Sequence, residues 1–329
     1  MVIIKSDKIS KFIYITPSGI IVNHRKYFVN NFVANLIKIS YLLFCFIPFF
    51  YIMSTRGDFM KVLSKLQVPA IAGVIREKTA KAAIAEIKNC MYDGADMIDL
   101  HMSCLENSDT DTLREIIQSS KLPILALNYN GRYDWSTAGF SEEERAESFL
   151  RAVDAGAAGI DMQGYTFHAP SKDGFCGEDK YSFTKGNPKE IVTDEAIISK
   201  QCEFIEKIHS KSAEVLLSCH PGVPMNCQQV VELALFLEKR NPDIIKIVTA
   251  ATNEDELVES FKTMAALKKE VKTPVSYHAN GKAGSLSRII NPILGGQIIF
   301  CVDRFSQSST MEQLDLKTVK TIIDNMKKI

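Results

Sequence analysis

The sequence has no excess of either charge sign and no long run of like charges. Its 329 residues include 39 basic and 39 acidic side chains, and five like charges never follow one another. A protein that grips nucleic-acid phosphates needs a basic face, so this balance argues against general nucleic-acid binding. The composition also excludes collagen, a coiled coil, a polytopic membrane protein and a disordered tail.

Cysteine is too scarce for a disulfide scaffold. The eight cysteines are spread along the chain, and none belongs to a C-x-x-C pair. Half of them lie in apolar surroundings, where a reduced thiol behaves as a small hydrophobic side chain: Cys90, Cys202, Cys219 and Cys301. No residues stand at the spacing of a metal site, so we expect no metal.

Residues 1–60 differ in composition from the rest of the chain. They contain only two acidic residues, Asp7 and Asp58, and residues 32–53 are largely apolar. The apolar stretch reaches about the 20 residues that span a bilayer. We interpret residues 1–60 as an N-terminal extension: a membrane anchor, a signal-like region without a cleavage site, a disordered stretch or a mis-assigned start. Residues 61–329 form the expected catalytic domain, and we expect it in the cytoplasm, with membrane anchoring as the alternative.

The chain then repeats one unit, a short apolar run followed by a loop and an amphipathic helix. The expected strands are residues 68–74, 95–100, 122–128, 157–162, 214–219, 243–249, 273–278 and 297–302. The expected helices are residues 77–91, 109–119, 141–155, 194–211, 226–240, 253–269, 284–293 and 314–327. Strands that are apolar on both faces indicate a parallel sheet covered by helices, and eight such units favour a closed (β/α)₈ TIM barrel. No G-x-G-x-x-G follows the first strand, which argues against a dinucleotide-binding fold.

Lys246 lies at the centre of the apolar run 243–249. Burial removes water from an ammonium group and so favours the neutral amine, which is a nucleophile. Such a lysine can form a Schiff base with a ketone or an aldehyde. It can instead make a structural ion pair inside the barrel, with Asp161 or Asp99. Of the two, we favour the Schiff base.

Histidines stand at the ends of three expected strands. His220 is placed for proton transfer near neutral pH, and imine chemistry needs an acid or base that moves the α-proton. Asp99 and His101 alternate to the same face of their strand. They could orient a substrate hydroxyl, pair with the lysine or form a polar collar at the barrel mouth. His278 ends the seventh strand, where a functional and a structural role are equally open.

Arg288 follows a glycine-rich turn, residues 280–289 (NGKAGSLSRI). A guanidinium at the mouth of a barrel can hold a substrate carboxylate through two hydrogen bonds. The alternative is an arginine on an ordinary helix surface. The turn could also bind a phosphate through backbone N–H groups at the start of the helix.

Three motifs occur in the order and at the strands where one family has them. They are S-x-H at residues 218–220, D-I-I-K-I at 243–247 and G-K-A-G-S-L-S-R-I at 281–289. With them the chain resembles type I 3-dehydroquinate dehydratase from about Leu66 to its end. That family is a (β/α)₈ barrel, often a homodimer, which needs no cofactor. It eliminates water from 3-dehydroquinate through a lysine imine, in the shikimate pathway.

The resemblance implies a role for several residues. Lys246 corresponds to the Schiff-base lysine and His220 to the general acid and base. Arg288 corresponds to the arginine that holds the carboxylate of a small keto-acid substrate, and Ser306 to a substrate-binding serine. Asp99 and His101 stand where the family has a glutamate and an arginine that bind substrate.

The chain departs from the family pattern at the substrate pocket. At Asp99 the charge is kept with a shorter reach, whereas His101 lacks the guanidinium. The family also has an arginine and a glutamate after the third strand, for which Arg132 is the only candidate replacement. Its glutamine in the last loop falls at about Thr310, and the loop 163–193 is unusually long, as expected of a lid or binding loop. The imine residues are kept while the pocket is rebuilt.

Two rival functions stay open on the sequence. A class I aldolase or lyase that acts on another keto acid would use the same buried lysine. A binding protein or regulator on the same scaffold would recognise ligand without chemistry, but binding alone requires neither Lys246 nor His220.

Overall fold

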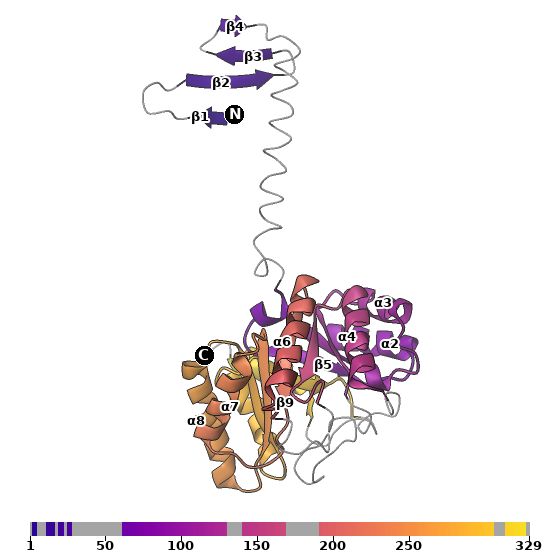
Figure 1. Cartoon of the computed structure of the whole chain (residues 1–329), viewed down its shortest axis with the longest axis vertical. Coiled ribbons are helices and arrows are strands. Elements are labelled where there is room, and N and C mark those ends of the chain that lie inside the picture. Colours follow the sequence, from indigo (N-terminus) through magenta and orange to yellow (C-terminus); the bar gives the residue numbers. More distant parts are fainter. Residues whose placement is uncertain are drawn as a thin grey trace. The chain divides into compact units, whose positions relative to one another are not determined.

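This computed structural model of the protein describes residues 61–129, 140–168, 191–305 and 313–326, and the backbone of four short strands within residues 2–27 (Figure 1). The Cα positions group into two compact units, residues 1–59 and 60–329. The anchor considered at residues 32–53 lies outside the described residues. In the described part of the chain, no helix is long and apolar enough to cross a membrane.

The smaller unit contains an antiparallel sheet in the order β1-β2-β3-β4. Its strands are β1 Val2–Ile4, β2 Lys11–Thr16, β3 Gly19–Val22 and β4 Arg25–Tyr27. Aromatic and β-branched residues dominate β2 (KFIYIT) and β3 (GIIV), a composition that favours strands. These strands were not predicted from the sequence.

The larger unit is built on a parallel sheet in the order β11-β10-β9-β8-β7-β6-β5-β12-β13. The strands are β5 Ala70–Ile75, β6 Met97–His101, β7 Ile124–Leu127, β8 Gly159–Gln163, β9 Glu214–Cys219, β10 Ile244–Ala250, β11 Val275–Asn280, β12 Ile298–Val302 and β13 Leu314–Asp315. At the start of β12, the Gln297 N–H donates to the carbonyl of Val275 in β11 at 2.8 Å. The sheet therefore curls round on itself, and the predicted TIM-barrel-like fold is confirmed.

Helices follow the strands and cover the outside of the curled sheet (Figure 1). They are α2 Ala80–Tyr92, α3 Thr110–Gln118, α4 Glu142–Asp154, α6 Glu195–Ser210, α7 Cys227–Glu238, α8 Glu254–Glu270, α9 Ser287–Ile293 and α10 Leu316–Met326. Short polar side chains cap the N-termini of several helices by accepting a backbone N–H. In α4 and α7 the caps Ser141 and Asn226 form complete capping boxes. These caps fix where the connecting loops end.

Two apolar layers hold the barrel together. The outer layer lies between the strands and the helices, and the inner layer fills the bottom of the barrel. Leu63 of the 3₁₀ helix η1 (Leu63–Lys65) belongs to the inner layer. The Glu214 carboxylate fixes η1 by accepting the backbone N–H groups of residues 62–64 at 2.5, 2.6 and 2.9 Å. The bottom of the barrel is thus closed, and its other end is left for a site.

Candidate active site

The strand period of two determines which side chains face the inside of the barrel. Ala70, Ala72 and Val74 of β5 belong to the inner apolar layer, so the next inward position is residue 76. Other strands make the same change from apolar at the bottom to polar at the carboxyl end. The pocket at this end is lined by Val74, Arg76, Asp99, His101, Tyr129, His220, Lys246, Val248, His278, Asn280, Arg288, Phe300 and Gln313.

Lys246 reaches this pocket from the middle of β10. Its side chain is only 7% exposed, and its Nζ lies 3.1 Å from Oδ2 of Asp161. The Nζ also lies 4.4 Å from the centre of the Phe300 ring, which screens it from water. The ion pair considered from the sequence is therefore present, with Asp161 as the partner. Because the lysine also lines the pocket, the ion pair does not remove it from reach of a ligand.

Asp161 is completely buried in β8 and is held on both oxygens. Its Oδ1 accepts hydrogen bonds from the Ser218 hydroxyl at 2.5 Å and from the Gln163 amide at 3.3 Å. Its Oδ2 is left for Lys246. A buried carboxylate needs such donors, because an unpaired charge away from water is very unfavourable.

His220 follows β9 directly, is fully buried and lines the pocket. The ring of Tyr129 lies edge-on to that of His220, with 5.9 Å between the ring centres. Tyr129 makes the same kind of contact with His101, also at 5.9 Å. A rigid aromatic side chain therefore stands between the two imidazoles and fixes their orientation.

Asp99 and His101 lie on the same face of β6, as the alternation of side chains predicted, and form a buried pair with each other. His101 Nε2 lies 3.3 Å from Oδ2 of Asp99. Burial by itself would raise the pKa of Asp99, but His101, Lys246 and Arg76 together outweigh burial. The pKa of Asp99 is therefore held below its usual range. Its Oδ1 has no hydrogen-bond partner among the described residues, so this oxygen is available to a donor on a ligand.

His278 is a neutral histidine in the pocket. Burial lowers its pKa well below the ordinary 6.5, and the positive charges of Arg288 and Lys246 lower it further, with a smaller contribution from His220. An uncharged imidazole adds no positive charge beside the lysine. His278 is therefore suited to hydrogen bonding in the pocket.

The lowered pKa of His278 predicts that acid destabilises the fold. The unfolded chain takes up a proton near pH 6.5, whereas the folded chain resists it, so stability present above pH 6.5 is lost as the pH falls below it. This group contributes a slope of about 1.4 kcal/mol per pH unit in that window. Urea denaturation at pH 7.5 and 5.5 should show a smaller loss of unfolding free energy for His278→Gln than for the wild type. Equal losses would contradict the expectation.

Arg288 reaches the pocket from the first turn of α9. Its Nη2 donates to Oδ1 of Asn280 at 2.5 Å. The turn before it is fixed by Ser287, whose hydroxyl lies 2.8 Å from the N–H of Ala279. Gly284 is required in this turn, because a Cβ there would lie 2.5 Å from the carbonyl oxygen of Ala279. The glycine-rich segment therefore positions a guanidinium at the pocket.

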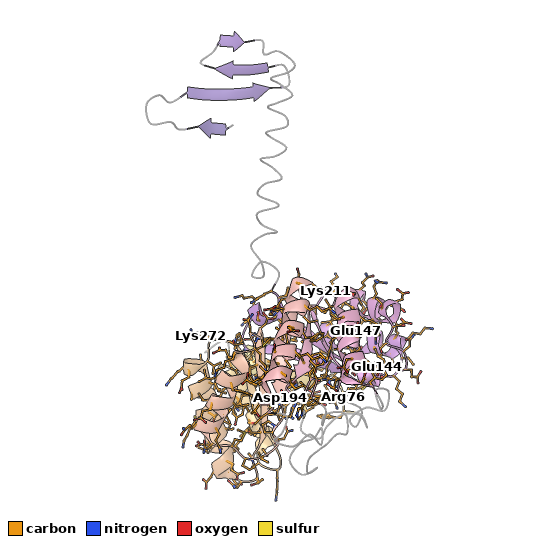
Figure 2. The ribbon with its side chains drawn as sticks, in the orientation of Figure 1. Arg76, Glu144, Glu147, Asp194, Lys211 and Lys272 are labelled. Atoms are coloured by element: carbon orange, nitrogen blue, oxygen red, sulfur yellow. The ribbon has the colours of Figure 1, made fainter. Side chains whose placement is uncertain are left out.

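Several pocket residues were not foreseen, among them Arg76, Tyr129 and Gln313. Arg76 directly follows β5, and Tyr129 lies just beyond β7. Figure 2 shows Arg76 and Asp194, the cap of α6, at the same end of the larger unit, with Lys211 at the opposite end. Gln313 is nearly buried and also lines the pocket, three residues beyond the position at which the sequence analysis expected a glutamine.

Some predicted residues cannot be placed. Ser306, Thr310 and Arg132 lie outside the described residues, as does most of the loop 163–193. Within the described residues, no cluster of three or more histidine, cysteine or carboxylate side chains could hold a metal ion.

Comparison of the sequence with known proteins gives one consistent result. Residues 189–329 match the model of the family Type I 3-dehydroquinase. The 3-dehydroquinate dehydratase of Methanobrevibacter smithii is 21% identical over 263 residues, which cover 79% of this chain and 95% of the relative. The enzyme of the same name from Coxiella burnetii is 26% identical over 125 residues, 37% of this chain and 52% of that protein.

The chain is similar in sequence to the type I 3-dehydroquinases.

Solved structures of 3-dehydroquinate dehydratases share the fold of this chain. The type I 3-dehydroquinate dehydratase of Clostridium difficile, with covalently modified comenic acid, has a TM-score of 0.61 at 16% identity, over 80% of this chain and 94% of that one. The 3-dehydroquinate dehydratase of Geobacillus kaustophilus has a TM-score of 0.62 at 13% identity, over 80% and 92%. The resemblance predicted from the three motifs is thus confirmed, and the aldolase and binding-protein alternatives are not favoured.

Proposed function

We propose that the protein is a type I 3-dehydroquinate dehydratase, a hydro-lyase that works through an imine on Lys246. The observation that supports this most directly is the placement of a buried lysine amine in one pocket with His220 and Arg288. The similarity of the chain to 3-dehydroquinate dehydratases supports the same substrate.

The first step is condensation of the Lys246 amine with the C3 ketone of 3-dehydroquinate. The neutral amine attacks the carbonyl carbon, and loss of water gives a protonated imine. Asp161, 3.1 Å from the amine, accepts the proton that the attacking nitrogen gives up or stabilises the resulting cation. Phe300 above the amine excludes water from the reacting centre.

The second step is elimination. The protonated imine withdraws electrons and so acidifies the neighbouring C2–H. His220 takes this proton, and the electron pair moves into the imine to give an enamine. The enamine electrons then form the C1–C2 double bond and restore the protonated imine as the C1–O bond breaks. His220 gives its proton to the departing C1 hydroxyl, which leaves as water. Hydrolysis of the product imine releases 3-dehydroshikimate and restores Lys246.

The remaining pocket residues hold the substrate in place. Arg288 binds the carboxylate through its guanidinium, and Ser306 contributes a hydroxyl by the resemblance. The Oδ1 of Asp99, which has no partner among the described residues, accepts a hydrogen bond from a ring hydroxyl, and His101 keeps that carboxylate ionised. Because the ring is held in this way, the binding energy offsets the entropy cost of bringing the reacting groups together.

Arg76 provides a guanidinium at the rim where His101 stands in place of an arginine. We expect Arg76→Met to raise the KM for 3-dehydroquinate by about 10- to 100-fold, since a charged hydrogen bond contributes roughly 1.5–3 kcal/mol. The kcat should change little, because the side chain does not touch the reacting carbons. Steady-state kinetics check this, with Lys262→Met at an exposed ion pair as the control. A normal KM would exclude Arg76 from substrate binding.

The wider setting follows from the same proposal. The enzyme would serve aromatic biosynthesis through the shikimate pathway, in the cytoplasm and as a homodimer, with no cofactor. An anchored form would need residues 32–53 to enter a membrane. Size-exclusion chromatography with light scattering tests the dimer.

The decisive experiment traps the imine. The full chain is incubated with 3-dehydroquinate and borohydride, digested and analysed by mass spectrometry. We expect a reduced adduct on Lys246, and ultraviolet absorbance from the enone product in the unreduced sample. A folded protein that gives neither adduct nor enone would overturn the proposed function.

A further inference from the structure

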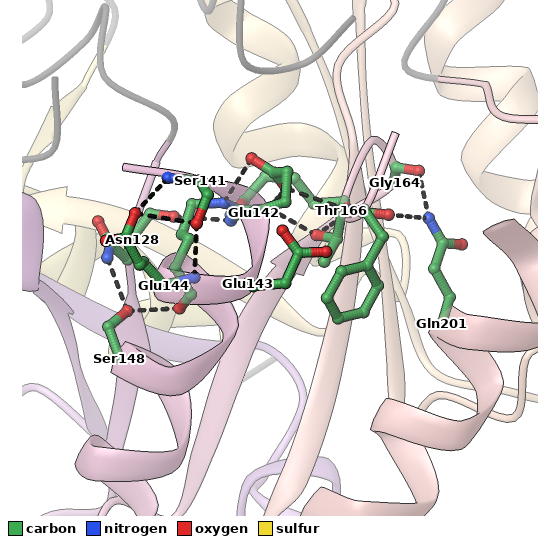
Figure 3. A network of polar contacts seen from close by, with 12 residues as sticks. Asn128, Ser141, Glu142, Glu143, Glu144, Ser148, Gly164, Thr166 and Gln201 are labelled. Carbon is green, nitrogen blue, oxygen red and sulfur yellow. Dashed lines mark hydrogen bonds and ion pairs between the residues drawn. The ribbon is translucent and has the colours of Figure 1, made fainter. Parts of the chain in front are cut away.

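A buried arginine lies behind the wall of the pocket, on α4. Arg145 is 1% exposed, and Glu142 one turn earlier is 6% exposed. The Glu142 carboxylate accepts two hydrogen bonds from this guanidinium, from Nε at 3.2 Å and from Nη2 at 2.7 Å. Figure 3 shows Glu142 within this network of polar contacts. Such a two-pronged pair fixes the plane of the guanidinium.

The guanidinium of Arg145 uses every one of its donors inside the protein. Besides Glu142, it donates to the carbonyl of Asn128 at 2.9 Å, to Oε1 of Gln163 at 2.5 Å and to the hydroxyl of Thr166 at 2.8 Å. An arginine has five N–H groups, and these contacts together with the two to Glu142 occupy all of them. Arg145 therefore has none left for a ligand, and its role lies in what it holds.

What it holds is the amide of Gln163, at the end of β8. Because Arg145 can only donate, Gln163 must present its oxygen to the arginine and turn its NH₂ the other way. That NH₂ donates to the carbonyl of Asp161 at 2.8 Å and lies 3.3 Å from its Oδ1. The Asp161 Oδ2 then faces Lys246 at 3.1 Å. An unbroken chain of polar contacts thus runs from α4 to the lysine amine.

We propose that Arg145 and Gln163 are positioning residues for the amine of Lys246. They fix the rotation of the Asp161 carboxylate and share its negative charge. The carboxylate in turn holds the amine at the pocket and determines the pH at which the amine becomes free to react. This inference rests on the proposed function, in which that amine forms the imine.

Electrostatics gives the direction of the effect. A carboxylate that receives strong donors on one oxygen attracts an ammonium less strongly through the other. A negative charge at position 163 would stabilise the ammonium of Lys246, so a higher pH would be needed to release the neutral amine. The other charged or titratable side chains that line the pocket with Lys246 are Arg76, Asp99, His101, Tyr129, His220, His278 and Arg288. None of these residues is replaced in the variants at position 163.

The test measures the reactivity of Lys246 without substrate. The full chain is labelled with acetic anhydride over a range of pH, and the acetylated Lys246 peptide is quantified by mass spectrometry against the exposed Lys262. For Gln163→Glu we expect the pH of half-maximal labelling to rise by about one unit. For Gln163→Met, which removes the donors without adding charge, we expect a smaller rise. Circular dichroism identifies the folded variants.

The control is Glu143→Gln, on the same helix. Glu143 is 66% exposed and pairs with Lys200 at the surface, so its loss removes an α4 charge outside the chain of contacts. We expect its labelling profile to match the wild type. Wild-type profiles in folded Gln163→Glu and Gln163→Met would overturn the inference, as would an equal shift in Glu143→Gln. Because acetylation needs no 3-dehydroquinate, a missing borohydride adduct would contradict the proposed function separately.

Discussion

Replacing Lys246 by methionine should abolish turnover of 3-dehydroquinate, with a loss of roughly 10⁴-fold or more, as for other covalent nucleophiles. Without the amine no imine forms, and the C2 proton is then no longer acidified. The readout is enone absorbance at saturating substrate, together with the absence of a borohydride adduct. An active Lys246→Met enzyme would exclude the imine mechanism.

This substitution has a structural consequence that needs its own control. Methionine leaves Asp161 as a fully buried carboxylate without its cation, which costs about 3–5 kcal/mol of stability when one partner of a buried pair is removed. Lys246→Arg keeps a positive charge beside Asp161 but cannot form an imine. We expect it to be folded and inactive. Activity in Lys246→Arg would show that the lysine acts through its charge alone.

The barrel could be predicted from the sequence because its strands are buried on both faces. Runs such as 214–219 and 243–249 lack a solvent-exposed polar face, so the apolar run itself marks the strand. Polar caps such as Asn226 mark where helices begin. The short strand β13 could not be predicted. A strand of two residues is too short to show an alternation of apolar and polar side chains, and its pairing with β12 depends on the fold around it.

The site could be predicted where a polar residue interrupts an apolar strand. Lys246 and Asp99 stand out because a charge in such a run needs a reason. Arg76 was missed although the period of two from Val74 points to it, because the predicted strand ended too early. The alternation of inward positions, followed one step beyond each strand, would have found it.

Arg145 could not have been found in this way. It follows Glu142 by three residues, a spacing typical of an exposed ion pair on a helix surface. It is buried because the turn after β8 covers it, and Gln201 of α6 fixes that turn by donating to the carbonyls of Gly164 and Thr166 at 2.9 and 2.8 Å (Figure 3). Such burial depends on contacts between distant parts of the chain, which helical periodicity does not encode.

Replacing His220 by alanine should slow elimination by a factor on the order of 10²–10⁴ while leaving imine formation intact. The two steps use different groups, since the amine of Lys246 attacks the ketone and the imidazole moves the C2 proton. Borohydride should therefore still trap the adduct on Lys246, now with the carbon skeleton of unreacted substrate. Exchange of the C2 proton with deuterated solvent should fall together with kcat.

The matched control is His278→Ala, which removes a second buried imidazole from the same pocket. Burial and the neighbouring positive charges lower the pKa of His278, so it stays neutral and is a weak proton acceptor. We expect this variant to retain proton exchange at C2. If His220→Ala lost substrate binding and adduct formation but exchanged the C2 proton at the normal rate once saturated, His220 would be a binding residue. The acid–base role would then pass to another group of the pocket, with the paired Asp99 and His101 as the nearest candidates by chemistry.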